Sequence, residues 1–259
     1  MYNDVIEYLD KKRVKEALVQ LSALAHEADD WKLSSEIENL QTTYNYMLQY
    51  ASQGMEDPER NKLYHKLLRR AYELADSAEL IRKYHTGSGY QQGKYRVMKQ
   101  FESKSFRDYC LSLEAFSEDL GMAQISIMDD KSRSKSIDDI YARHEKDVTE
   151  LFDKIWISTH WTDEDLAGSN AILESLLVPA NDVAVMISAV TLSLLQLFDS
   201  RKFQFLIKAY QTHSEAIVTQ RALTGIALAT YYQEKRLQLY PELKEALSLL
   251  NDSTPVAQE

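Results

Sequence analysis

The chain has 259 residues, of which 44% are hydrophobic, so it can bury a sizeable core. Its seven glycines and four prolines are few for this length, which favours long helices with short connections over β-sandwich or α/β folds. The formal net charge is −10, and acidic residues outnumber basic residues in each third of the sequence. This balance argues against nucleic acid and anionic membranes as main partners.

Two further features bear on the compartment. Cys110 is the single cysteine, which excludes an intramolecular disulfide and is typical of a reducing setting. The longest uncharged stretch, from Val183 to Phe198, is shorter than the ~18–20 residues of a spanning helix and contains polar side chains. We therefore expect a cytoplasmic protein without a membrane segment.

The first predicted helices occupy residues 14–25 and 33–51. In the second, steps of four and three residues give one apolar face, formed by Leu33, Ile37, Leu40, Tyr44, Met47 and Ala51. Asp29 and Asp30 separate the two helices, and such a short polar break predicts an antiparallel hairpin. A helix-start pattern at Asp57-Pro58-Glu59 then predicts a third helix, which reaches Tyr84.

The middle of the chain is less regular. Residues 86–93 hold three of the seven glycines and are expected to form a flexible Gly-rich loop. A helix follows over residues 106–120. The polar residues 126–136 are expected to be a mobile linker, so that residues 1–125 form an N-terminal helical-hairpin subdomain and residues 137–250 a second subdomain.

Helical periodicity then continues to the end of the second subdomain. Helices are expected over residues 137–155, 162–178, 180–198, 199–210, 214–232 and 240–250, and residues 251–259 are expected to be a disordered tail. The segments Ser188-Ala189-Val190-Thr191 and Arg221-Ala222-Leu223-Thr224 occupy matching places, which indicates a repeat of about 33–37 residues. Gly225 is expected to allow a neighbouring backbone to approach closely.

These patterns predict an all-α fold in which antiparallel helix hairpins stack as a short α-solenoid. Residues 160–250 resemble HEAT-type repeats. The N-terminal hairpin resembles the second half of a tetratricopeptide unit through Lys15-Glu16-Ala17-Leu18. The whole resembles bacterial helical-repeat proteins that combine both kinds of pair, and this resemblance implies a protein-binding scaffold.

Three short segments match catalytic motifs only in part. In Gly87-Ser-Gly-Tyr-Gln-Gln-Gly93-Lys94-Tyr95, Ser88 stands where a Walker loop needs Gly, and Tyr95 stands where it needs Ser or Thr. His144-Glu145 begins a His-Glu-x-x-His zinc pattern, but Val148 takes the place of the second histidine. Ser132-Arg-Ser-Lys135 matches Ser-x-x-Lys without its companion motifs. No catalytic, cofactor or metal residue is therefore assigned.

Acidic and thiol groups also favour structural roles. Asp163, Glu164 and Asp165 stand at an expected helix start, where acids favour the helix dipole. Cys110 lies among apolar residues, so we expect a buried structural thiol.

Tyrosine and tryptophan supply the candidate partner-binding residues. Sixteen tyrosines are present, and Tyr is enriched at interfaces because it joins a large area to a polar tip. Packing within helix hairpins is the alternative for these side chains. Aromatic density nominates a surface formed by Tyr84, Tyr90, Tyr95, Trp156 and Trp161.

The favoured function is a non-catalytic scaffold or adaptor for a protein or peptide. The last helix is expected to expose an apolar face, which would serve a homodimer or a longer chain. The alternatives are an enzyme with a helical active site, of which a HEAT-like nucleic-acid enzyme is disfavoured by the acidic charge, and a regulatory domain of a longer protein.

Overall fold

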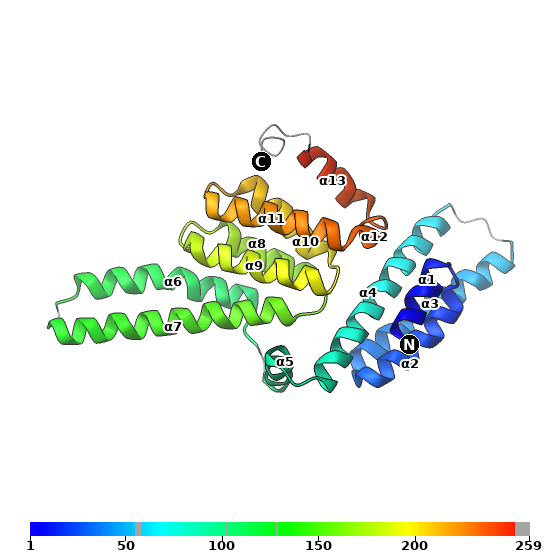
Figure 1. Ribbon diagram of the computed structural model, residues 1–259, viewed down its shortest axis with the longest axis horizontal. Helices are drawn as coiled ribbons and strands as arrows, with labels where there is room; N and C mark the ends of the chain where they lie inside the picture. The colour runs from blue at the N-terminus through cyan, green and yellow to red at the C-terminus, as the bar shows by residue number, and fades with distance from the viewer. Residues whose placement is uncertain (55–57, 102, 128, 252–259) are drawn as a thin grey trace. The chain divides into compact units, whose positions relative to one another are not determined.

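The computed structural model describes residues 1–54, 58–101, 103–127 and 129–251. Within these ranges every regular element is an α-helix, and the helices pack against one another (Figure 1). The predicted all-α fold class is therefore confirmed. The chain divides into two compact units, Met1–Arg96 (unit 1) and Val97–Glu259 (unit 2).

Unit 1 is built around its second helix. Its helices are α1 (Tyr2–Asp10), α2 (Val14–Ala28), α3 (Trp31–Ser52), α4 (Arg60–Thr86) and the first part of α5 (Tyr90–Gln100). Helix α2 packs against α1, α3 and α4. It therefore buries its apolar residues on several sides, among them Ala17, Leu18, Leu21, Leu24 and Ala25.

The predicted hairpin of α2 and α3 is present. Asp29 ends α2 in the left-handed conformation, with a φ of 49°, and short acidic side chains tolerate this region better than most. The carboxylate of Asp30 then caps α3 by accepting from the backbone N–H groups of Lys32 and Leu33. Two successive aspartates thus set the reversal of the chain.

The outer half of α3 is less completely covered than its first half, and its apolar residues Tyr44, Met47 and Ala51 are only partly buried. Its buried residues are Leu33, Ile37 and Leu40, whereas Tyr46 and Tyr50 are more than half exposed. Helix α3 has 22 residues and α2 has 15, and a helix rises 1.5 Å per residue, so α2 is too short to cover all of α3. The apolar periodicity of α3 therefore continues beyond the core.

Unit 2 is a stack of helix pairs in two layers. Contacts join α7 to α9 and α9 to α11 in one layer, and α6 to α8 and α8 to α10 in the other. A short helix and a last helix follow. The bounds are α6 (Phe106–Ile125), α7 (Asp130–Ile157), α8 (Asp163–Glu174), α9 (Ala180–Gln196), α10 (Ser200–Thr212), α11 (Ala216–Tyr232), α12 (Glu234–Leu237) and α13 (Pro241–Asn251).

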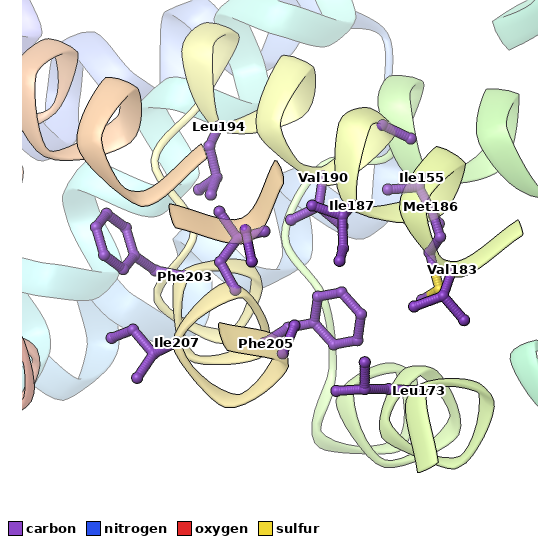
Figure 2. Packing of buried hydrophobic residues seen from close by; sticks show 14 of the residues in the cluster. Ile155, Leu173, Val183, Met186, Ile187, Val190, Leu194, Phe203, Phe205 and Ile207 are labelled. Atoms are coloured by element: carbon purple, nitrogen blue, oxygen red, sulfur yellow. The ribbon is translucent and has the colours of Figure 1, made fainter. Parts of the chain in front are cut away.

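The interior of unit 2 is a single apolar cluster that extends from Phe106 to Leu250. Figure 2 shows side chains of α7, α8, α9 and α10 that meet in this interior, with Phe203 and Phe205 as its large members. Helix α11 approaches α9 closely at Gly225, where a Cβ atom would lie 2.3 Å from Thr191 Oγ1. The expected role of Gly225 is therefore confirmed.

Two expectations about segments need correction. The described part of residues 126–136 is not a linker, because α7 begins at Asp130 and packs against α6. The carboxylate of Asp129 accepts from Ser132 N, so this acid starts a helix that apolar periodicity alone did not reveal. Residues 90–93 of the expected Gly-rich loop belong to α5. Of the expected tail, residues 252–259 lie outside the described residues.

The last helix covers its apolar face within its own chain. Leu243 and Leu250 of α13 are 2% and 6% exposed and belong to the cluster of unit 2. These leucines therefore offer no surface to a second copy, and a homodimer through this helix stays a prediction. Leu249 is the leucine of α13 that is largely exposed.

Candidate partner-binding sites

Two of the three candidate tyrosines, Tyr84 and Tyr95, meet at the corner between α4 and α5. The rings of Tyr84 and Tyr95 lie 4.9 Å apart, and Arg96 Nη2 donates to the carbonyl oxygen of Gly87 at 2.7 Å. Gly87 is needed here because a Cβ atom would lie 2.9 Å from the carbonyl oxygen of Lys83. The glycines therefore serve a tight helix-to-helix corner and not a phosphate loop, since a helix precedes them where a Walker loop follows a strand.

Only part of this tyrosine group is accessible. Tyr84 is 1% exposed. It packs in the core and offers no surface to a partner, in contrast to the expectation from the sequence. Burial raises its pKa well above the usual value and raises the pKa of Tyr95 to about 12. Tyr90, by contrast, is 56% exposed, with Lys94 Nζ 5.2 Å from the centre of its ring.

The two candidate tryptophans belong to unit 2 and lie in different surroundings. Trp161 is 2% exposed, and its ring packs at 5.3 Å from Phe106 and 5.8 Å from Phe205. It is a core residue, so its expected role in partner binding is wrong. Trp156 is partly exposed on α7, with its ring 5.7 Å from Phe152.

A lysine is buried inside unit 2 beside Trp161. Lys202 of α10 is fully buried. Its ammonium donates to the carbonyl oxygens of Ser158 at 3.1 Å and Thr159 at 2.8 Å, and to Ser193 Oγ at 2.8 Å. Three acceptors thus satisfy its three donors, and the lysine ties the end of α7 to α9 and α10.

Asp199 supplies a negative charge near this lysine. Its carboxylate accepts from Trp161 N at 2.7 Å and from Arg201 N at 2.8 Å. Burial lowers the pKa of Lys202 to about 8, although Asp199 and Asp165 act in the opposite direction. A lowered pKa is typical of catalytic lysines, but complete burial and three intramolecular acceptors leave this amine no access to a substrate.

His144 is half-buried and paired, as expected for a structural histidine. Its Nε2 lies 3.0 Å from Asp182 Oδ2, and its ring stacks on Phe116 with centres 3.8 Å apart. Burial raises the pKa of Asp182 in spite of the attraction of His144. The pair joins α7 to α9 beside a shallow hollow of about 320 Å³.

Cys110 is buried, and burial raises the pKa of its thiol to about 11. A buried thiol of this kind is a poor nucleophile. Across the ranges that the structure describes, no three His, Cys, Asp or Glu side chains are placed to hold a metal ion. Those same ranges contain no helix long and apolar enough to cross a membrane.

The most suitable concave surface lies at one end of the stack in unit 2. A groove of about 620 Å³ runs between the α8–α9 connection and the α10–α11 connection. Its lining residues are Ser117, Leu173, Glu174, Ser175, Leu176, Leu177, Val178, Pro179, Ala180, Thr212, His213, Ser214 and Glu215. We call this surface the loop groove.

Two leucines dominate the apolar part of the loop groove. Leu176 and Leu177 are 99% and 59% exposed. They were expected to continue helix 162–178, but α8 ends at Glu174. Ser175 Oγ accepts from Leu177 N at 3.2 Å and donates to Glu114 Oε1 at 2.6 Å, which diverts the chain out of the helix.

Hydrogen bonds from α6 hold the α8–α9 connection in place. Ser117 Oγ of α6 donates to the carbonyl oxygen of Leu177 at 3.2 Å. Together with the bond between Ser175 and Glu114, it fixes the backbone that carries the exposed leucines. The apolar run Leu176-Leu177-Val178 directly before Pro179 is the sequence signal that could have indicated this surface.

The rim of the loop groove carries two glutamates, one of which pairs with a lysine. Glu174 and Glu215 line it, and Lys208 Nζ lies 2.5 Å from Glu174 Oε1. Glu215 N donates to His213 Nδ1 at 3.1 Å. Because Lys208 offsets the charge of Glu174, Glu215 is the carboxylate that supplies negative charge beside the exposed apolar side chains of the groove.

No family model, curated protein sequence or solved structure matches the chain.

Proposed function

We propose that the chain is a non-catalytic helical-repeat scaffold of the α-solenoid type, and that its loop groove binds a peptide segment of a partner protein. The observation that carries the proposal is the exposure of Leu176 and Leu177 on a fixed backbone inside a concave surface. Covering each of these leucines in a complex would contribute about 1.5–3 kcal/mol of burial free energy, and neighbouring exposed apolar side chains in a concave surface are typical of a binding site.

The chemistry of the groove selects the kind of peptide. Apolar side chains of the peptide would cover Leu176 and Leu177, and a neighbouring Lys or Arg would approach Glu215. The formal charge of −10 favours the approach of a basic segment over long distances. The partner is therefore a peptide in which an apolar residue stands beside a basic one.

The non-catalytic part of the proposal has separate support. The side chains that most resemble catalytic groups, Lys202 and Cys110, are buried. Lys202 has its hydrogen bonds satisfied by the chain itself. Since Cys110 is the single cysteine, we also propose a reducing, cytoplasmic setting.

A displayed library of random short peptides, selected on the full chain, tests the proposal. We expect enriched peptides that share an apolar residue next to Lys or Arg and that bind with micromolar affinity. The double substitution Leu176→Ser and Leu177→Ser should weaken them at least tenfold. Leu249→Ser, which changes an exposed leucine on α13, is the matched control and should leave binding unchanged.

The selection also has outcomes that contradict the proposal. A library that yields no shared motif would count against a peptide-binding groove. Equal binding by the double variant and the control would show that the enriched peptides bind elsewhere. Because both groove leucines are exposed, far-ultraviolet circular dichroism should show the fold of the double variant unchanged.

A further inference from the structure

The two outer helices of one layer in unit 2 differ in charge. Contacts join α7 to α9 and α9 to α11 (Figure 1), so α7 and α11 stand at the two ends of this layer. Helix α7 has 13 Asp, Glu, Lys or Arg residues among its 28, whereas α11 has one among its 17. The outer helix of a stack normally keeps a polar outer face. Helix α11 therefore has the composition of an internal helix, although it ends its layer.

The single charged residue of α11 is turned toward α9. Arg221 Nη1 donates to the carbonyl oxygen of Ala184 at 3.1 Å and to Ser188 Oγ at 2.9 Å. Gly225 approaches Thr191 of α9 on the same side of the helix. The guanidinium is thus used in packing between neighbouring helices, and the opposite side of α11 has no formal charge.

That opposite side is an exposed stripe of apolar and small polar residues. Ile217 and Leu228 are 38% and 39% exposed, and Tyr231 is 78% exposed. The exposed positions follow one another in steps of three and four residues, which places them on one face of the helix. We call this surface the α11 face, and its residues are Ile217, Gln220, Thr224, Ala227, Leu228 and Tyr231.

The α11 face is complementary to itself. Thr224 is its midpoint, because Ile217 stands seven residues before it and Tyr231 seven residues after it. If two copies of α11 pack antiparallel about a two-fold axis at Thr224, Ile217 of each copy meets Tyr231 of the other. Thr224 Oγ1 donates to the carbonyl oxygen of Gln220 at 2.8 Å. Two threonines can therefore face each other at the axis with both hydroxyl protons satisfied.

Charge favours a second copy in this orientation. The exposed Glu215 precedes α11 and the exposed Lys235 follows it. Antiparallel packing brings the acidic end of each helix beside the basic end of the other and opposes the two helix dipoles. Because each copy has a formal charge of −10, two copies approach with least repulsion through a surface without charge.

We propose that the chain forms a symmetric dimer in which the α11 faces of two copies pack antiparallel. One helix pair of about 25 Å buries less than the ~1,600 Å² of a standard interface, so we expect a micromolar dissociation constant. The dimer goes beyond the proposed peptide binding. It would also combine two loop grooves in one assembly, which raises the avidity for a partner with two binding segments.

Sedimentation velocity on the full chain tests the proposal. The chain is measured from about 1 to about 100 µM, a range that brackets a micromolar dissociation constant. We expect a reversible shift from monomer to dimer as the concentration rises. A chain that stays monomeric over the whole range would overturn the proposal.

A pair of charge variants tests the two-fold axis at Thr224. Thr224→Lys and Thr224→Glu each place two like charges at the axis, so each variant alone should dimerise at least tenfold more weakly than the wild type. An equimolar mixture of the two should recover a mixed dimer, detected by fluorescence energy transfer between differently labelled chains. Without this recovery the proposed axis is wrong, because recovery requires that position 224 meets itself.

Matched controls separate the α11 face from other surfaces. Thr149 is exposed on α7, at the other end of the layer, so Thr149→Lys and Thr149→Glu should leave dimerisation within about twofold. The double leucine variant of the loop groove and Leu249→Ser on α13 should dimerise as the wild type does. Loss of the dimer in any of these controls would contradict the proposal and assign the contact to another surface.

A second type of variant covers the case in which a charge at residue 224 disturbs the helix. Tyr231→Ser changes a side chain that is 78% exposed and that contributes to the dimer twice by symmetry. It should weaken dimerisation by about tenfold and leave the helical circular dichroism unchanged. Dimerisation equal to that of the wild type would show that the α11 face is not the interface.

Discussion

A helix at the centre of a unit and a helix at its margin differ in how completely they are covered. In unit 2, α9 lies between α7 and α11 and buries eight of its 17 residues. In unit 1, α3 buries three of its 22 residues. A helix with neighbours on both sides is apolar on almost all of its faces. A helix at the margin of a stack has a single apolar stripe. The contrast shows that sequence periodicity alone does not say how much of a helix the fold will cover.

The units also differ in their buried polar contacts. Unit 1 joins its first and last long helices by tyrosine–aspartate hydrogen bonds, from Tyr2 to Asp76 and from Tyr72 to Asp10, each of 2.6 Å. Unit 2 places a lysine at its centre and satisfies it with backbone and hydroxyl oxygens. Loss of a buried partner is costly, so we expect the interior of unit 2 to be less tolerant of substitution.

The largest expected effect is a cavity in unit 2. Phe205→Ala removes a fully buried ring that packs on Trp161, and such truncations cost about 3–5 kcal/mol. Urea unfolding followed by tryptophan fluorescence, in a Trp31→Phe background, measures the loss, because the remaining tryptophans belong to unit 2. Amide hydrogen exchange in α2 should be unchanged, and faster exchange there would show that the two units unfold together.

The corresponding change in unit 1 comes next. Leu21→Ala empties a fully buried position on α2, the helix that contacts α1, α3 and α4. We expect a loss of about 3 kcal/mol, detected as faster amide exchange throughout α1, α2 and α4. Val19→Ala is the control on the same helix, because Val19 is 60% exposed. An equal loss for the two variants would contradict the assignment of α2 as the centre of unit 1.

A smaller effect concerns pH and Lys202. Its pKa in the folded state is about 8, below the ordinary lysine value of 10.5, so between these values the unfolded chain binds more protons than the folded chain. Stability should therefore rise with pH in this window. Relative to Lys202→Met, the wild type should gain on the order of 2 kcal/mol from pH 8 to pH 10.

Denaturant unfolding of the two proteins across this range, followed by Trp161 fluorescence, measures the difference. Cys110 titrates in both proteins, and its raised pKa makes each less stable as pH rises above the value of a free thiol, so its effect cancels in the comparison. Parallel pH profiles for the two proteins would show that Lys202 does not release its proton in this window.

Local signals predicted much of the fold. The apolar stripe of α3, the two aspartates before it and the close approach at Gly225 are all encoded within a few residues and appear as expected. Helix α5 was missed because it buries no side chain and so carries no apolar period. Its position depends on contacts from Tyr95 and Arg96 to α4.

The candidate sites depend on contacts that the sequence does not display. Trp161 was expected at the surface from aromatic density, but Asp199, which lies 38 residues away, binds its backbone N–H and draws it into the core. Lys202 stands in an amphipathic helix like many exposed lysines, and its acceptors come from α9 and from the end of α7. The leucines of the loop groove were assigned to a helix because apolar runs alone do not show where Ser175 ends α8.

The smallest expected effect tests the reversal between α2 and α3 at the margin of unit 1. Asp30→Ala removes the acceptor of two first-turn N–H groups, which costs about 1 kcal/mol. Tyr46→Ser, at an exposed position of α3, should change stability by less than about 0.5 kcal/mol, because exposed positions contribute little. Thermal unfolding followed by circular dichroism would compare the two variants. A larger loss for Tyr46→Ser would mean that a partner covers the outer half of α3 in solution, and concentration-dependent melting would then identify that partner as a second copy of the chain.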